Sequence, residues 1–173
     1  MNNKIISFLF RRTIFLKIFS IVLLLNVNSY GQINNIDEYF SKVDSFFKTY
    51  VNDGLVNYNE VSSNRKSLSE LTNFISEVNI DKIGNDSKKK AFLINSYNLL
   101  VIKVISEKYP INSPRDIPGF FNFIEHNIGE EDYTLDELEK QLLFAKYDDP
   151  RLHFVLVCAA LSCPEIINEA YKA

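Results

Sequence analysis

The sequence predicts a mainly α-helical domain with a small β-hairpin (α+β), in which amphipathic helices surround a buried helix at about residues 87–108. The buried helix is predicted because the segment "AFLINSYNLLVIKVI" is apolar nearly all round, which is typical of a helix covered on most faces. The surrounding helices are predicted because apolar residues recur at spacings of three and four in neighbouring segments.

Two amphipathic helices are predicted ahead of the buried one. The first begins after Asn35, which makes a capping box with Glu38, and the second is expected to be capped by Ser67 with Glu70. A turn at residues 53–54 separates them. The apolar faces of the two helices comprise Ile36, Tyr39, Phe40, Val43, Phe46, Phe47 and Tyr50, then Leu68, Leu71, Phe74, Ile75 and Val78.

Beyond the buried helix, turn-forming residues punctuate the chain. Residues 109–121 hold three prolines and a glycine, which predicts a long structured loop. The segment "FNFIEHNIGEEDYTL" predicts the hairpin, with its turn at "GEED". Thr134 with Glu137 is expected to cap a fourth helix, and "PEIINEAYKA" predicts the start of a further helix near Pro164.

The first 31 residues are predicted to be a secretory signal peptide. They contain no Asp or Glu, carry four basic residues, and end in an apolar run followed by small residues at Ser29 and Gly31, just before Gln32. The alternative is a membrane anchor, but a spanning helix needs about 20 apolar residues and this run is half as long. We therefore expect an exported protein, periplasmic or extracellular, that is cleaved near Gly31 and has no membrane span in its mature part.

Cleavage would leave a single domain at residues 32–173. Four basic groups leave with the leader, so the formal net charge moves from −3 to −7. This acidic balance argues against a nucleic-acid partner, because phosphate contacts need clustered Lys and Arg. The basic run at residues 88–90 is expected to be a solvated face. The expected partner is an unknown small molecule or protein.

Both cysteines and one of the two histidines lie in the segment "HFVLVCAALSCP". A disulfide between Cys158 and Cys163 requires the chain to turn between them, since five residues of straight helix or strand separate the Cα atoms by more than about 7 Å. A zinc site would need a fourth ligand and other spacings, so no metal and no cofactor are predicted. A reactive thiol and a piece of sulfur-containing core remain as alternatives.

Of the two cysteines, Cys163 is the better candidate for a nucleophile. Cys158 ends an apolar run and is expected to be a small core residue. Cys163 precedes Pro164, so that either it or Ser162 would cap the helix expected there. The N-terminus of a helix favours a thiolate and lowers the pKa of a cysteine.

Asn95 and Asn98 interrupt the apolar helix three residues apart, so they share one face. A buried amide must find hydrogen-bond partners, and the simpler interpretation is a polar network that fixes the helix against a neighbouring loop. The catalytic alternative makes His153 the general base for Cys163, with Asn98 or Glu139 orienting the imidazole.

Three segments resemble the domain-of-unknown-function 547 (DUF547) family, in the family's order. "KAFLINSYNLLVIKVI" resembles its "aFWINxYNxLvlh", "NIGEEDYTLDELEKQLL" its "igGxxySLxdIEhxiL", and "DPRLHFVLVCAALSCPEI" its "DPRxHFALvCgaxSCPpi". The resemblance runs from about residue 38 to the end. The family's pattern falls on Asn95, Tyr97, Asn98, Glu139, Arg151, His153, Cys158, Ser162, Cys163 and Pro164.

Three positions depart from the family's pattern. Leu93 stands where Trp is usual, Lys140 where His is usual, and Ala159 where Gly is usual. The missing histidine puts in doubt any mechanism that needs a Glu-His pair in the fourth helix. Family domains also continue beyond "AY" into further helices, so the resemblance implies that this chain lacks its C-terminal helices.

The resemblance names no reaction, so different classes of function stay open. Some relatives join the domain to glutaredoxin-like modules, which hints at thiol chemistry by association. The first hypothesis is a thiol-dependent enzyme, either a cysteine hydrolase or transferase or a thiol–disulfide partner, with Asn95, Arg151 and Ser162 binding the ligand. The second is a non-catalytic exported binding module with structural cysteines, whose ligand meets the loop at 109–121. A third is a truncated copy without function.

Overall fold

The computed structural model describes residue 33, residues 35–160 and residues 163–173. The predicted signal peptide and its cleavage site lie outside the described residues, so both remain predictions. The described residues share a hydrophobic core, whose largest fully buried side chains include Tyr39, Phe47 and Phe92.

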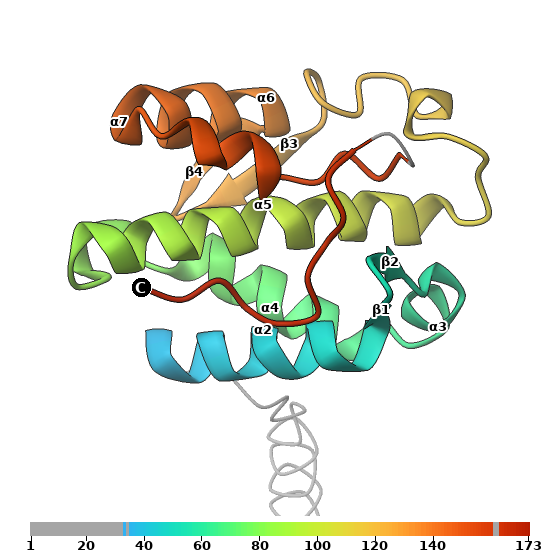
Figure 1. The fold of residues 1–173 in the computed structure, drawn as a ribbon, viewed down its shortest axis with the longest axis horizontal. Coiled ribbons are helices and arrows are strands. Elements are labelled where there is room, and N and C mark those ends of the chain that lie inside the picture. Colours follow the sequence, from blue (N-terminus) through green and yellow to red (C-terminus); the bar gives the residue numbers. More distant parts are fainter. Residues whose placement is uncertain (1–32, 34, 161–162) are drawn as a thin grey trace, which may run out of the picture. The chain divides into compact units, whose positions relative to one another are not determined.

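Helix α5 (Asp86–Lys108) is the centre of the fold, as predicted, and every residue from Ala91 to Ile102 is buried. In Figure 1, α5 crosses the middle of the domain, with α2 (Ile36–Tyr50) and α4 (Lys66–Glu77) on one side. A hairpin and a further helix lie on the other side. Within the described part of the chain, no helix combines the length and the apolar character needed to cross a bilayer.

The predicted N-cap residue is correct for α2 and wrong for α4. α2 begins as predicted, with the Oδ1 atom of Asn35 accepting a hydrogen bond from the Glu38 N–H at 2.9 Å. α4 begins one residue before Ser67, so the predicted Ser67 cap is wrong. A short helix that the sequence did not predict, α3 (Tyr58–Ser63), ends just before α4. The Ser67 hydroxyl therefore lies inside the first turn, buried and without a hydrogen-bond partner among the described residues.

Two antiparallel hairpins occur in the described part of the chain. Their strands are β1 (Val51–Asn52), β2 (Leu55–Val56), β3 (Glu125–Ile128) and β4 (Glu131–Thr134). The first surrounds the turn predicted at 53–54, and the second is the predicted hairpin. It is shorter than predicted because the preceding backbone turns back, with the N–H groups of Phe123 and Ile124 donating to the Gly119 carbonyl at 2.9 and 3.1 Å.

The fourth helix starts with the predicted capping box. The Thr134 hydroxyl accepts from the Glu137 N–H at 3.2 Å, and the Glu137 carboxylate accepts from the Thr134 N–H at 2.9 Å. The helix then changes its winding through α6 (Leu135–Glu137), the π-helical η3 (Leu138–Phe144) and α7 (Ala145–Tyr147). Apolar periodicity does not predict this π-helical segment, a form that is rare and frequent at functional sites.

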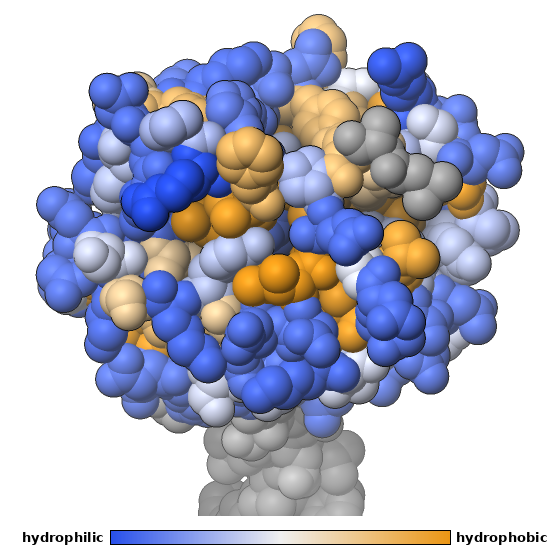
Figure 2. Space-filling view, viewed as in Figure 1, coloured by the Kyte–Doolittle hydropathy of each residue, from blue (hydrophilic) through white to orange (hydrophobic). Residues whose placement is uncertain are grey.

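Polar side chains dominate the face of the domain in Figure 2, with apolar patches showing between them. Two of the three lysines of the basic run at 88–90 are engaged in ion pairs. Lys88 pairs with Asp37 at 2.7 Å, and Lys90 pairs with Asp149 at 2.6 Å.

The last part of the chain crosses the domain in extended form. After the 3-10 helix η4 (Pro150–Phe154), the described residues 163–173 form no helix, so the helix predicted near Pro164 is wrong. Ile166 and Ala170 still reach the core, and the Ala170 N–H donates to Asp44 of α2 at 3.2 Å. Burial of an extended chain produces the spacing that resembles a helix here (Figure 1).

Ala159 has a positive φ of 56°, at the position where the DUF547 pattern has glycine. This left-handed conformation costs a non-glycine residue about 1–2 kcal/mol. We predict that Ala159→Gly raises the free energy of unfolding by about 0.5–1 kcal/mol, once the greater freedom of glycine in the unfolded chain is counted. Urea unfolding followed by circular dichroism measures this change.

Ala160→Gly is the matched control, because Ala160 does not share the positive φ. Glycine there adds only freedom to the unfolded chain and is expected to lower the free energy of unfolding by about 0.4–1 kcal/mol. Changes of the same sign at both positions would contradict the interpretation.

Candidate functional site

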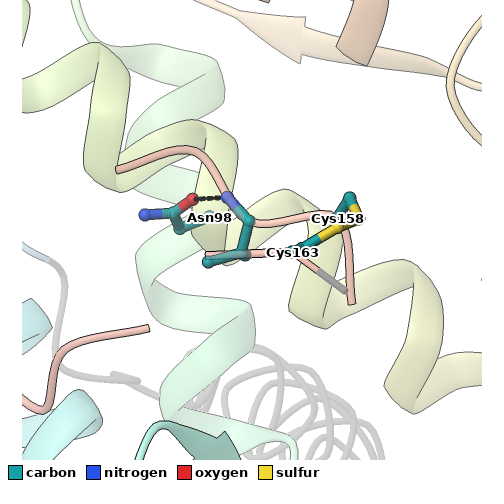
Figure 3. The surroundings of a disulfide bond; sticks show 4 residues. Asn98, Cys158 and Cys163 are labelled. Atoms are coloured by element: carbon teal, nitrogen blue, oxygen red, sulfur yellow. Dashed lines mark hydrogen bonds between the residues drawn. A yellow bond between two sulfur atoms is a disulfide. The ribbon is translucent and has the colours of Figure 1, made fainter. Parts of the chain in front are cut away.

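Asn98 of α5 holds the chain that leads into the cysteine segment. Its Nδ2 atom donates to the Val155 carbonyl at 2.9 Å, and its Oδ1 atom accepts from the Val157 N–H at 3.1 Å. Figure 3 shows this amide pointing at the backbone just before Cys158. A buried side-chain amide here pairs with a peptide backbone as a neighbouring strand would.

Asn95 makes the same kind of contact one turn earlier on α5. Its Nδ2 atom donates to the Tyr171 carbonyl at 2.9 Å, and its Oδ1 atom accepts from the Tyr171 N–H at 3.0 Å. These bonds support the polar-network interpretation of both asparagines. They do not support Asn98 as the residue that orients His153, because the hydrogen bonds described for the Asn98 amide go to backbone atoms.

Cys158 and Cys163 form a disulfide, with their Cα atoms 5.9 Å apart (Figure 3). The chain turns between them, as such a bond requires, and the Cys163 N–H donates to the Ala160 carbonyl at 3.0 Å. In this oxidised form neither sulfur is a thiolate, so Cys163 can act as the predicted nucleophile only after reduction. Cys163 also lies outside any helix, which removes the reason to expect a lowered pKa.

Glu139 and His153 are the two predicted catalytic residues that the structure brings near one another. Glu139 of η3 is half-buried and lies close enough to the Tyr97 hydroxyl of α5 and to His153 on η4 for both to influence its pKa. Burial and the charge of Asp136 raise the pKa of Glu139, whereas His153 and Lys140 oppose this rise. Burial, then the charge of Glu139, raises the pKa of Tyr97. Such a carboxyl group, beside a phenol and an imidazole, can hold and transfer a proton.

The imidazole of His153 is exposed and packs against Phe144 of η3, with ring centroids 4.5 Å apart. Glu139 and Phe144 are five residues apart, which is the hydrogen-bonding interval of a π-helix. The winding of η3 thus brings both toward His153. Lys140, at the position of the family's histidine, pairs instead with Asp136 at 2.7 Å.

Arg151, a predicted ligand-binding residue, is engaged with a neighbouring carboxylate. Its Nε and Nη2 atoms donate to Asp149 at 2.9 and 2.8 Å, and Lys90 donates to the same carboxylate at 2.6 Å. These bonds hold the pKa of Asp149 well below its usual value. Arg151 lines a cavity of about 380 Å³, where an anion would have to compete with Asp149 for its guanidinium.

Ser162, the other predicted binding residue of the cysteine segment, lies outside the described residues and keeps its role only as a prediction. In the described part of the chain, no group of three or more His, Cys, Asp and Glu side chains is placed to hold a metal ion.

Sequence reasoning missed the roles of two residues at this site. Tyr97 falls on the family's pattern, and its signal is a hydroxyl within an otherwise apolar helix. Asp149 caps η4 by accepting from the Arg151 N–H at 3.1 Å, and its signal is an aspartate directly before a proline.

The two hydrogen bonds between the Asn98 amide and the backbone of Val155 and Val157 lead to a prediction about stability. Asn98→Leu keeps a side chain of similar size but leaves the Val155 carbonyl and the Val157 N–H without their partner. Unpaired buried groups cost about 1–3 kcal/mol each, so we expect the free energy of unfolding to fall by about 2–5 kcal/mol in urea titrations. The exposed Asn122 is the control, because its change to Leu should stay within about 0.5 kcal/mol. An equal fall in the free energy of unfolding for the two variants would contradict this role of Asn98.

The raised pKa of Glu139 generates a prediction about pH. The folded protein keeps this proton at pH values where the unfolded chain has lost it, so the unfolded chain binds fewer protons. The free energy of unfolding should therefore fall as the pH rises from the ordinary glutamate pKa to the raised value. Urea titrations at a series of pH values should show this fall, and Glu139→Gln should remove it.

Glu137 is the matched control, because its hydrogen bonds with Thr134 lower its pKa. Its contribution is present above the ordinary glutamate pKa and is lost as the pH falls, which is the opposite dependence. If Glu137→Gln, rather than Glu139→Gln, removed the fall at rising pH, the assignment to Glu139 would be wrong.

The family comparison agrees with the three motifs. A family model described as "Protein of unknown function, DUF547" matches residues 81–173, which is more than half of the chain. The matched region contains α5, the β3–β4 hairpin, the fourth helix and the disulfide. No curated protein and no solved structure matches the chain. The matched length and the position of every predicted site residue within it lead to one conclusion: the chain belongs to the DUF547 family.

Proposed function

We propose that this DUF547 protein is an exported binding module that works with its two cysteines joined. The observation that carries the proposal is the Cys158–Cys163 disulfide. Disulfides form and persist in oxidising compartments and are rare in the cytosol. The first 31 residues have the pattern of a secretory leader, so the two features support the same location.

A structural role suits the position of the disulfide between two fixed points. Asn98 fixes the chain at residues 155–157, and Asn95 fixes it again at Tyr171. The disulfide closes a short loop in the part that lies between these points, which stabilises the fold by about 2 kcal/mol. With its sulfur in this bond, Cys163 supplies no nucleophile for a cysteine hydrolase or transferase.

The surface we assign to the ligand is the one formed by Glu139 and His153, above the buried Tyr97. It offers a half-buried carboxyl group and an exposed imidazole beside the apolar ring of Phe144. Polar groups of this kind next to an apolar surface fix the orientation of a bound molecule. The ligand is a small molecule or a protein, and the loop at 109–121 remains a further predicted contact.

Thiol–disulfide exchange is the second candidate, favoured by the partial exposure of both cysteines. A mainly apolar cavity of about 260 Å³ is lined by sequence neighbours of both cysteines, Ala159 and Pro164, together with residues that include Leu55 and Tyr58. A partner's thiolate would attack one sulfur, form a mixed disulfide and release the other cysteine as a thiolate. A second partner thiolate would then displace the remaining cysteine, leaving the partner oxidised and this pair reduced.

Export and the disulfide have a joint test. We expect the full chain, expressed in a bacterium, to accumulate outside the cytoplasm with Gln32 as its first residue. Mass spectrometry should show the intact mass rising by two hydrogens when the protein is reduced. A cytoplasmic protein that keeps Met1 would contradict export, and an unchanged mass would contradict the disulfide.

Glutathione buffers separate the binding module from the exchange partner. A structural disulfide should stay oxidised, and closed to iodoacetamide, in mixtures that reduce an exchange-active pair. In Cys158→Ser the remaining Cys163 should then be alkylated with an ordinary cysteine pKa of about 8.5. Ready reduction of the native protein, or alkylation of Cys163 well below that pH, would favour thiol chemistry instead.

A further inference from the structure

The imidazole of His126 on β3 has a buried nitrogen that lacks a hydrogen-bond partner among the described residues. Its side chain is only 5% exposed, and its Nε2 atom is buried with no partner among the described residues. Burial, then the charge of Lys103, lowers the pKa of His126 to about 4, so the imidazole is neutral at physiological pH. Buried polar atoms without partners are rare in native structures, and each one asks for a physical explanation.

His126 lines a cavity of about 260 Å³ between α4, α5 and β3. The α4 wall is polar, formed by Ser69, Thr72, Asn73 and Ser76, whose spacing of three and four puts them on one face of the helix. The hairpin is fixed to the end of this wall, because the N–H groups of Gly129 and Glu130 donate to the carbonyls of Ile75 and Ser76, both at 2.9 Å. These backbone hydrogen bonds therefore join the α4 wall of the cavity to the hairpin that carries His126.

The hydrogen bonds already made by the walls leave both acceptors and donors toward the cavity. Thr72 donates its hydroxyl proton to the Leu68 carbonyl at 3.0 Å, and Ser76 donates to the Asn73 carbonyl at 2.8 Å. One N–H of the Asn127 amide donates to Asp132 at 3.1 Å, which leaves its second N–H and its carbonyl oxygen. Each of these groups can still accept a hydrogen bond from a ligand.

The charges at the cavity argue for a neutral ligand. Lys103 of α5 and Glu125 of β3 both line the cavity. An anion would meet the Glu125 carboxylate, and a cation would meet the Lys103 ammonium group. A hydroxyl group both donates and accepts, so a compound with several hydroxyls matches walls that present both acceptors and donors, and it carries no charge to meet either Lys103 or Glu125.

We propose that this cavity binds a small neutral polyhydroxyl compound, of the size of a single sugar ring, with His126 as one of its contacts. The Nε2 atom is closed to solvent, so contact with a ligand hydroxyl requires the imidazole to turn about its Cβ–Cγ bond, a torsion whose preferred angles are broad. The site depends neither on the disulfide nor on export, and none of its lining residues belongs to the surface formed by Glu139 and His153, although both sites use α5. Its failure would leave the function proposed above untouched.

The test uses the purified protein with D-glucose, D-galactose and myo-inositol as probes, and acetate and methylammonium as charged comparators. The chain has two histidines, so a nitrogen-detected spectrum of the imidazoles resolves His126 from the exposed His153. We expect a saturable shift of His126 and of the α4 amides with at least one polyol, with a Kd of about 1 mM, and none of His153. Saturation by acetate or methylammonium alone, or by no probe, would overturn the proposal.

Two variants on opposite walls complete the test. His126→Phe keeps a ring of similar shape without Nε2, so the α4 amide shifts should need at least about tenfold more polyol. Asn73→Leu, at an exposed position on the α4 wall, should weaken binding in the same way through lost space and polarity. Asn59→Leu, at an exposed position of α3 that does not line the cavity, is the matched control and should bind as the parent does. Unchanged affinity in both wall variants would show that the polyol binds elsewhere.

Discussion

Two asparagine amides on a buried helix hold the C-terminal part of this domain in place. α5 is covered on most faces, so a polar side chain on it must find partners inside the protein. Asn95 and Asn98 find them in the backbone of chain segments that have no helix or strand of their own. One contact satisfies both sides, since the extended chain also needs partners for its peptide groups. The position of the disulfide and of η4 relative to α5 follows from these bonds.

The sequence predicts the parts of the fold that rest on local rules. α5, α2 and the capping box at Thr134 follow from apolar periodicity and side-chain oxygens at helix starts. The failures occur where tertiary contacts decide. The spacing of Ile166 and Ala170 mimics a helix, yet the chain there is extended because Asn95 and Asp44 take its backbone donors. The π-helical winding of η3 has no local signature at all.

The candidate site shows the same division. Spacing alone places both asparagines on one face and requires a turn for a disulfide, and the structure contains both features. The sequence offers the pairing of Glu139 with His153 as only one of two alternatives, because the residues belong to separate elements, η3 and η4, whose contact is decided by tertiary packing. The sequence likewise does not reveal that the Nε2 atom of His126 is buried without a hydrogen-bond partner among the described residues, because its burial depends on how a hairpin packs against α4.

The asparagine contacts have a consequence for how this family can vary. Asn98 bonds to a carbonyl and an N–H that flank Leu156, and Asn95 bonds to both peptide groups of Tyr171. Both amides form these hydrogen bonds with backbone atoms, which differ little from one residue type to another. The bonds therefore do not select the side chains of this segment. A groove that recognises backbone alone accepts many sequences in the same register, as β-augmentation does between molecules. The domain therefore binds its own C-terminal segment through the peptide backbone. Substitutions along that segment are limited by the packing of its side chains and not by the hydrogen bonds of Asn95 and Asn98.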